Sequence, residues 1–160
     1  MQYIIQAPQH LDTTIKLPAS KSISNRALII HALAGGEIIP DNLSDCDDTN
    51  VIVNAFRNMP DVIDIMGAGT AMRFMTAYLS VTPGEHTLTG TERMKHRPIE
   101  ILVDALRLLG ADIQYLNEKG YPPLRIKGKT LKGGTLEIPG TVSSQYISAL
   151  LMIAPILKNG

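Results

Sequence analysis

Residues 17–34 read LPASKSISNRALIIHALA, in which small and basic polar residues lead into an apolar run that favours a helix. Ser20, Ser22 and Ser24 are candidate N-caps, because a serine oxygen can accept the free backbone N–H groups of a first helical turn. Apolar residues recur at helical spacing and predict the buried side of this helix: Ile23, Ala27, Ile30 and Ala34.

The same stretch predicts a polar side near the start of the helix. Lys21 lies four residues before Asn25 and Ser22 lies four before Arg26, so we expect all four on one face. The N-terminus of a helix carries partial positive charge and free N–H donors. Cations there oppose the helix dipole, so their presence needs another reason, such as a bound anion. The residues therefore predict a site for a phosphate or carboxylate. The alternative is a capped surface helix with a solvated basic face.

The composition is that of a globular protein of one ordinary domain. Its 160 residues suffice to bury a core, and 44% of them are hydrophobic while 19% are charged. The formal net charge is zero, so no overall field attracts nucleic acid or an acidic membrane, and anion binding must come from local clusters. Cys46 is the only cysteine, which excludes an internal disulfide framework and a cysteine-cluster metal site. Without a secretory signal or an apolar run long enough to span a bilayer, we expect a cytoplasmic protein.

Strand and helix patterns alternate along the chain. Short strands are expected at residues 3–6, 13–17, 37–39, 62–66, 86–89, 113–116, 124–127 and 136–138. Helices are expected to begin near residues 20, 50, 69, 98 and 143. The apolar residues of the last two helices are Ile101, Ala105 and Leu108, and then Ile147, Leu150, Leu151 and Ala154. Strand, polar turn and helix recur at 17–24, 66–70, 90–99 and 138–145, which predicts a layered α/β arrangement whose helix starts converge on one edge.

Three of these helix starts offer further groups that could bind an anion. The turn at residues 67–70, GAGT, brings glycine backbone close to a helix start, although glycine also serves tight turns. Arg73 could aim back at a ligand or pair with a carboxylate, and both remain open. In RMKHR (93–97) four of five side chains are of basic type, and Arg97 is the best placed because Pro98 fixes its direction; a solvated basic loop is the alternative. The serines and glutamine at 143–145 could cap the last helix or donate to a ligand.

Five motifs, in the same order, resemble the signatures of one enzyme family. They are PASKSISNRAL (18–28), AGTAMR (68–73), RMKHRPI (93–99), GYPPL (120–124) and VSSQY (142–146). Together they are similar to the 5-enolpyruvylshikimate-3-phosphate synthase family almost from end to end. The resemblance implies an α/β fold of repeated βαβαββ units, the inside-out α/β barrel of the enolpyruvyl transferases, with the third unit incomplete in this chain.

The resemblance also implies a reaction on the shikimate pathway toward chorismate and the aromatic amino acids. The enolpyruvyl group of phosphoenolpyruvate passes to the 5-hydroxyl of shikimate 3-phosphate, and phosphate is released. The family works by addition and elimination through a tetrahedral intermediate, without a metal or an organic cofactor. Both substrates are anions, in agreement with the anion sites that the residues predict.

Roles for individual residues follow from the resemblance, motif by motif. Lys21 would be the catalytic residue and would contact both substrates. Ser22 and Arg26 would hold shikimate 3-phosphate. Gly69 would let its backbone approach phosphoenolpyruvate, and Arg97 would clamp the anionic groups of that substrate, a task suited to a planar guanidinium.

The last motif completes this set, and one position departs from the family. Ser143, Ser144 and Gln145 would bind the phosphate and hydroxyls of shikimate 3-phosphate. Gly67 stands where the family usually has an asparagine that contacts ligand, which puts this position in doubt as a binder. The interval between residues 58 and 62 is also too short for the β-hairpin that the family usually has there.

The resemblance further implies a domain arrangement. Family members are longer and have two similar domains that close over the substrates. Residues 13–160 would be the N-terminal, shikimate 3-phosphate-binding domain, truncated, while the strand and crossover at residues 1–12 would belong with the second domain. That second domain, which carries the acid–base groups, is absent, so we expect this chain to be an inactive half and the missing domain to be its partner.

Two other functions remain as alternatives. One is a stand-alone module that binds a sugar phosphate or another anion without catalysis. The other is the related enolpyruvyl transferase that acts on UDP-N-acetylglucosamine, against which the Ser-Lys-Ser and Ser-Ser-Gln motifs argue. No nucleic acid or membrane partner is expected.

Overall fold

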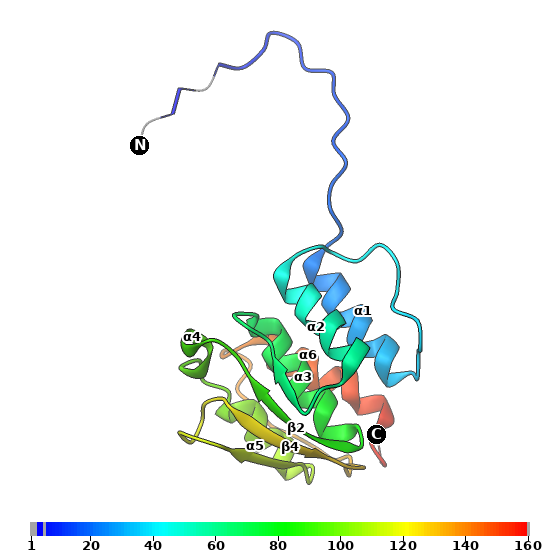
Figure 1. Cartoon of the computed structure of the whole chain (residues 1–160), viewed down its shortest axis with the longest axis vertical. Helices are drawn as coiled ribbons and strands as arrows, with labels where there is room; N and C mark the ends of the chain where they lie inside the picture. The colour runs from blue at the N-terminus through cyan, green and yellow to red at the C-terminus, as the bar shows by residue number, and fades with distance from the viewer. Residues whose placement is uncertain (1–2, 5, 160) are drawn as a thin grey trace.

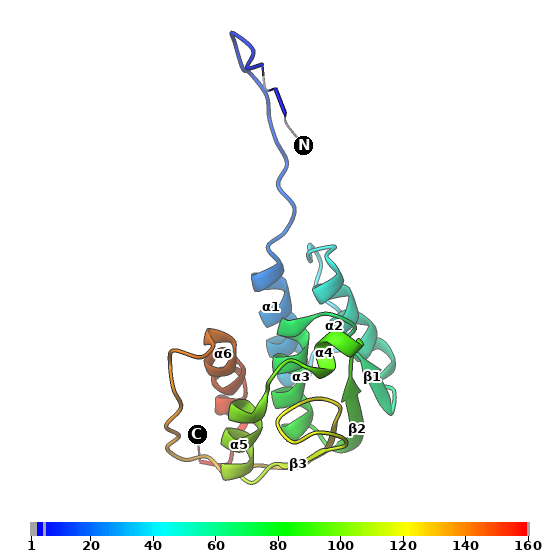
Figure 2. The same ribbon diagram turned by 90° about the vertical axis from the view of Figure 1, so that its left-hand side faces the viewer.

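Helix α3 (Gly69–Val81) lies at the centre of the fold, and nearly all of its residues are buried. Most of its residues are apolar, and the polar Arg73, Thr76 and Ser80 are buried as well, as in a helix enclosed by other elements. The computed structural model describes residues 3–4 and 6–159. The strands lie along one side of α3, while α1 (Lys21–Leu33), α2 (Asp47–Asn58) and α6 (Ser144–Ile153) contact it elsewhere (Figures 1 and 2).

The strands form one mixed sheet. They are β1 (Val62–Asp64), β2 (Gly84–Thr89), β3 (Asp112–Tyr115) and β4 (Leu124–Gly128), in the spatial order β1-β2-β4-β3. β1 pairs parallel with β2, and the other two pairings are antiparallel. The remaining helices are α4 (Glu92–Lys95), α5 (Glu100–Leu108) and the short 3-10 helix η1 (Ala154–Ile156). The chain therefore forms an α/β fold, and from β1 onward its elements follow in the order β1-α3-β2-α4-α5-β3-β4, which is βαβαββ apart from the short α4.

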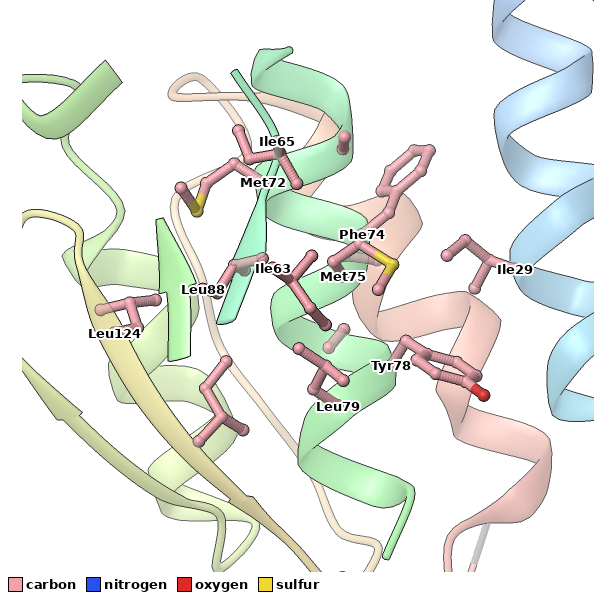
Figure 3. Close-up of a cluster of buried hydrophobic side chains, with 14 of the residues drawn as sticks. Ile29, Ile63, Ile65, Met72, Phe74, Met75, Tyr78, Leu79, Leu88 and Leu124 are labelled. Carbon is pink, nitrogen blue, oxygen red and sulfur yellow. The ribbon is translucent and has the colours of Figure 1, made fainter. Parts of the chain in front are cut away.

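The hydrophobic core surrounds α3 on two sides. Toward the sheet it includes Leu88 of β2 and Leu124 of β4, which are paired neighbours and fully buried. Toward the other helices, Phe74 and Tyr78 extend from α3 in the direction of Ile29 on α1 (Figure 3). All of these side chains belong to one buried cluster, so the central helix is fixed from both the sheet and the helical side.

The first predicted helix forms as α1, but its buried side differs from the prediction. Ser20 is the N-cap, with its Oγ accepting from Ile23 N at 3.5 Å, and Gly35 ends the helix with a φ of +76°. Ile23 is 70% exposed, and Ile30 and Ala34 are exposed as well. The buried residues of α1 are instead Ser24, Asn25, Leu28 and Ile29. The predicted polar face is also wrong at Asn25. Its Oδ1 accepts from Thr49 Oγ1 at 2.7 Å, and this buried bond turns that side of α1 inward.

Four predicted strands are absent from the described residues. Residues 13–17, 37–39 and 136–138 have no strand, and neither have the described residues of 3–6, of which Ile5 lies outside the description. A strand needs a paired neighbour to satisfy its backbone groups, and the sheet offers none to residues 13–17, 37–39 and 136–138. The described part of residues 3–20 instead runs away from the body as an extended arm (Figure 1).

Other boundaries shift for local reasons. α2 begins at Asp47, three residues earlier than predicted, because acidic residues suit the positive end of a helix. β1 ends at Asp64, since Met66 adopts a φ of +52° and donates its N–H to the Asp64 carboxylate at 2.7 Å. On α5, Leu108 is exposed rather than buried. On α6 the buried residues are Tyr146, Ala149 and Ile153, while the predicted Ile147 and Leu151 face outward.

Candidate functional site

Three helices of the core, α1, α3 and α6, begin at the same end of the body, the end from which the N-terminal arm leaves (Figures 1 and 2). Two side-chain hydrogen bonds tie them together there. Arg26 Nη2 of α1 donates to Ser148 Oγ of α6 at 3.1 Å. Gln145 Nε2 of α6 donates to Thr70 Oγ1 of α3, also at 3.1 Å. The predicted convergence of these helix starts is therefore present for three of them.

The start of α3 has free donors next to two arginines. Ala68 is the N-cap and provides no side-chain bond, so the first N–H groups of α3 have no partner within the helix. A Cβ added to Gly69 would meet Nη1 of Arg97 and would lie 2.6 Å from Nη1 of Arg73. Both guanidinium groups therefore reach the same point above the Gly69 backbone. A side chain at this position would displace the two arginine ends from the space that they occupy.

Arg97 is held in place by the segment on either side of it. Thr91 N donates to Met66 O at 3.0 Å, which joins this segment to the turn before α3. Arg97 N donates to Met94 O at 2.9 Å, and Tyr146 Oη of α6 donates to Pro98 O at 2.8 Å. The backbone at Arg97 is thus fixed from α4 and from α6, while its side chain remains exposed.

Arg73 is buried directly behind Arg97. Its Nη1 donates to Gly69 O at 2.7 Å, its Cζ lies 5.9 Å from the centre of the Tyr146 ring, and its Nε has no partner among the described residues. Burial and then the positive charge of Arg97 lower the pKa of Arg73, although the Tyr146 hydroxyl opposes this. The sequence left the role of this residue open. The structure shows that it does not pair with a carboxylate of the described chain.

A cavity of ≈ 440 Å³ lies beside Arg97. It is lined by Gly67, Thr91, Arg93, Met94 and Arg97. Neither Arg93 nor Arg97 forms an ion pair with a carboxylate in residues 3–4 and 6–159. A cavity with unpaired cations and a helix N-terminus nearby can take a small anion.

The three predicted site residues of α1 differ in their contacts, since Lys21 pairs with a carboxylate whereas Ser22 and Arg26 bond to each other. Lys21 Nζ lies 3.6 Å from Asp48 Oδ1 at the start of α2. Ser22 is exposed, and its carbonyl oxygen accepts from Arg26 Nη1 at 2.9 Å. Arg26 also lies over the ring of Phe74, 5.3 Å from its centre, so its position is well defined. All three side chains lie in the first two turns of α1, as the sequence predicts.

The residues at the start of α6 combine capping with exposure. Ser143 Oγ accepts from Gln145 N at 3.2 Å and caps the helix, while Ser144 is exposed. Gln145 reaches Thr70, one residue after Gly69. Sequence reasoning missed Thr70 and Ser148, the partners of Gln145 and Arg26, because ordinary hydroxyl residues give no local signal of a distant partner.

The arrangement can bind and stabilise negative charge. It brings Gly69, Arg97 and Arg73 to one point and connects them through Thr70 to the start of α6. Lys21 is held separately by Asp48. Across the part of the chain that the structure describes, no group of three or more His, Cys, Asp or Glu side chains is arranged to hold a metal ion. None of the described helices is both long and apolar enough to cross a membrane.

Comparisons with known proteins agree on one group of enzymes. The sequence profile of the family described as EPSP synthase (3-phosphoshikimate 1-carboxyvinyltransferase) matches residues 5–66 and 59–160. A 3-phosphoshikimate 1-carboxyvinyltransferase of Bacteroides fragilis is 64% identical over 160 residues, which are 100% of this chain and 39% of that protein. One from Haemophilus influenzae is 44% identical over 189 aligned residues, covering 99% of this chain and 44% of that protein.

A solved structure is similar over most of the fold. The EPSP synthase from Acinetobacter baumannii matches with a TM-score of 0.77 at 26% sequence identity, covering 89% of this chain and 38% of that chain. The chain spans 39% of the length of the Bacteroides relative.

Proposed function

The chain belongs to the EPSP synthase (3-phosphoshikimate 1-carboxyvinyltransferase) family, and from this we propose that it carries part of the site for that reaction. In the reaction, the enolpyruvyl group of phosphoenolpyruvate passes to the 5-hydroxyl of shikimate 3-phosphate and phosphate leaves. This chain would contribute the residues that bind the two anionic substrates. The observation that carries the proposal is the joining of the starts of α1, α3 and α6 by Arg26–Ser148 and Gln145–Thr70.

The proposed binding of shikimate 3-phosphate uses α1 and α6. Ser22 and Arg26 would bind from the first two turns of α1, and Ser143, Ser144 and Gln145 from the start of α6. The bond from Arg26 to Ser148 supports this, because it holds the two helix starts beside each other. A phosphate between them would receive hydroxyl and guanidinium donors together.

The proposed binding of phosphoenolpyruvate uses the start of α3 and the basic segment before α5. Gly69 would offer backbone N–H groups, and Arg97 would hold the carboxylate or phosphate of the substrate. The absence of a carboxylate partner for Arg97 in the described residues supports this role. Lys21 would contact both substrates after leaving Asp48, a step that costs little because exposed ion pairs are weak.

The proposed chemistry is addition followed by elimination. The 5-hydroxyl group gives its proton to a base while its oxygen bonds to the central carbon of phosphoenolpyruvate, and the methylene carbon takes a proton from an acid to become a methyl group. A base then removes a proton from that methyl group, the double bond re-forms, and the C–O bond to phosphate breaks so that phosphate leaves. The residues of this chain would orient the two anions and stabilise the charge that develops between them. The acid–base groups would come from a second domain, so we expect the chain alone to bind without turnover.

We extend the proposal to the domain arrangement. Residues 13–160 would form the shikimate 3-phosphate-binding domain, built of repeated βαβαββ units as in an inside-out barrel, and residues 1–12 would pair with the second domain. The order of the elements from β1 to β4 supports this, as does the N-terminal arm, whose described residues form no strand.

Calorimetric titration with shikimate 3-phosphate tests the binding part. We expect Arg26→Met to weaken binding by about tenfold or more, since a hydrogen bond to a charged group contributes about 1.5–3 kcal/mol. The matched control is Arg57→Met, which removes an exposed arginine from the last turn of α2. Equal affinity of the two variants would contradict the assignment of Arg26.

An assay of phosphate release with both substrates tests the catalytic part. Binding of shikimate 3-phosphate without phosphate release is the expected result for this chain, whereas robust turnover would show that no further domain is needed. Titration with UDP-N-acetylglucosamine separates the related transferase, because tighter binding of this sugar nucleotide than of shikimate 3-phosphate would favour that function instead.

A further inference from the structure

Arg73 carries a buried charge that the ring and hydroxyl of Tyr146 compensate in part, but that no carboxylate of the described residues balances. Its side chain belongs to a residue that is only 8% exposed, and it forms no ion pair with any carboxylate of the described residues. Nη1 donates to the carbonyl oxygen of Gly69, and Nε is left without a partner in the same part of the chain. Buried charges in proteins are normally paired, because removing a charge from water is costly.

The nearest charge makes the arrangement less favourable still. Nη1 of Arg73 and Nη1 of Arg97 both approach the point where a Cβ of Gly69 would lie, so two cations face each other across a glycine. Like charges at this range repel, most strongly where water is excluded. An anion at the start of α3 would relieve the repulsion and would also meet the free N–H groups of the first helical turn.

We propose that Arg73 is a positioning residue for the anion that binds between Arg97 and the first turn of α3. It does so from behind: it holds the Gly69 carbonyl, which orients that turn, and it places a second positive charge beside Arg97, which lines the cavity of ≈ 440 Å³. The ligand class is a small phosphate- or carboxylate-bearing molecule. Only the naming of that anion as phosphoenolpyruvate rests on the proposed function.

A purely structural role predicts something different. If Arg73 served only to hold Gly69 and to stack on Tyr146, its removal would destabilise the free chain and leave anion binding unchanged. If it is a positioning residue, removal of the buried charge offsets the loss of its hydrogen bond to Gly69, and the free chain keeps its stability. The structural role therefore predicts a lower melting temperature with unchanged anion binding, whereas the positioning role predicts weaker anion binding without a lower melting temperature.

The test compares Arg73→Met with Arg73→Lys, using Arg57→Met as a control for the loss of one positive charge. Each variant is titrated with inorganic phosphate and with phosphoenolpyruvate, and its melting temperature is measured with and without them. We expect Arg73→Met to melt no lower than the unaltered chain and to bind both probes about tenfold or more weakly. Arg73→Lys keeps the charge but not the fork, so its affinity should fall between the two. Arg57→Met should bind as the unaltered chain does.

Three results would overturn the proposal. The first is unchanged binding by Arg73→Met, and the second is failure of the unaltered chain to bind either probe. The third is a lower melting temperature of free Arg73→Met together with full restoration of both properties in Arg73→Lys. Titration with shikimate 3-phosphate, which would bind at α1 and α6, separates this from the proposed function. Failure to bind shikimate 3-phosphate alone counts against the proposed function. If shikimate 3-phosphate binds but the affinity for phosphate is the same with and without Arg73, the result counts against the positioning role.

Discussion

The substitution Gly69→Ala tests the geometry at the start of α3 with a single methyl group. The added Cβ would meet Arg97 Nη1 and would lie 2.6 Å from Arg73 Nη1 and 2.8 Å from Arg97 Cζ. All of these atoms are at the ends of flexible side chains, so the arginines would move and the backbone would stay. Alanine in a helix gains up to about 1 kcal/mol over glycine, while loss of the Arg73–Gly69 bond costs about 1.5–3 kcal/mol. We therefore expect the free energy of unfolding to fall by about 0.5–3 kcal/mol.

Anion binding should weaken even though the variant remains folded. A displaced Arg97 would lose at least one charge-assisted hydrogen bond to the anion, which contributes about 1.5–3 kcal/mol. At about 1.4 kcal/mol for each factor of ten, the dissociation constant for phosphoenolpyruvate should rise about 10- to 150-fold. Calorimetric titration measures this rise, and thermal unfolding followed by circular dichroism checks that the variant is folded.

Two other glycines serve as controls for this experiment. A Cβ at Gly140 would have nothing within 4 Å, so Gly140→Ala should leave both folding and binding unchanged. A Cβ at Gly128 would overlap the carbonyl oxygen of Thr82, which is backbone and cannot move aside, so Gly128→Ala should lose about 3 kcal/mol or more of stability. If Gly69→Ala binds phosphoenolpyruvate as tightly as Gly140→Ala does, the reasoning about the two arginines is refuted.

Three further predictions concern the core, a buried tyrosine and the ion pair of α1. Ile29→Ala should lower the free energy of unfolding by about 2–5 kcal/mol, because Ile29 is fully buried. Ile23→Ala should lower it by at most about 0.5 kcal/mol, because Ile23 is 70% exposed. Equal losses of this free energy, measured by urea unfolding, would contradict the observed buried face of α1. Burial raises the pKa of Tyr115 from 10.0 to about 12, and its hydroxyl has no partner in the described residues. The folded chain therefore retains a proton that the unfolded chain releases, so stability should fall as pH rises from 10.0 to about 12, and Tyr115→Phe should remove that part of the fall without loss at neutral pH. Asp48→Asn should release Lys21 and tighten shikimate 3-phosphate binding while changing stability by less than about 1 kcal/mol; weaker binding in the titration would argue against a binding role for Lys21.

Local signals in the sequence were enough for much of the fold. Ser20 as a cap, Gly35 as a helix stop and the turn before α3 follow from residue types with strong local preferences, and the structure confirms them. The alternation of strands and helices between residues 62 and 128 is also confirmed, because each strand there finds a neighbour in the sheet. The segments at 13–17, 37–39 and 136–138 have similar patterns but no such neighbour, and pattern alone cannot show this.

The buried side of α1 could not be predicted because polar residues form part of it. Asn25 bonds to Thr49, and Ser24 Oγ accepts from the backbone N–H of Ser44 at 2.9 Å. These partners lie about twenty residues away in sequence, so a hydrophobicity pattern assigns Ser24 and Asn25 to solvent. The same limit applies at the candidate site. Arg97 could be chosen from its basic segment and the following proline, whereas the burial of Arg73 and its lack of a carboxylate became visible only in three dimensions.

The central position of α3 ties the core to the proposed ligand. One helix supplies both the packing of Phe74 and Tyr78 and the first turn at Gly69, so a shift of its axis would move the anion site by the same amount. Substitutions far down the helix should therefore alter affinity even when the protein remains folded. Conversely, a bound anion should slow amide hydrogen exchange along the whole of α3, so that exchange at its far end becomes a remote reporter of occupancy at its start.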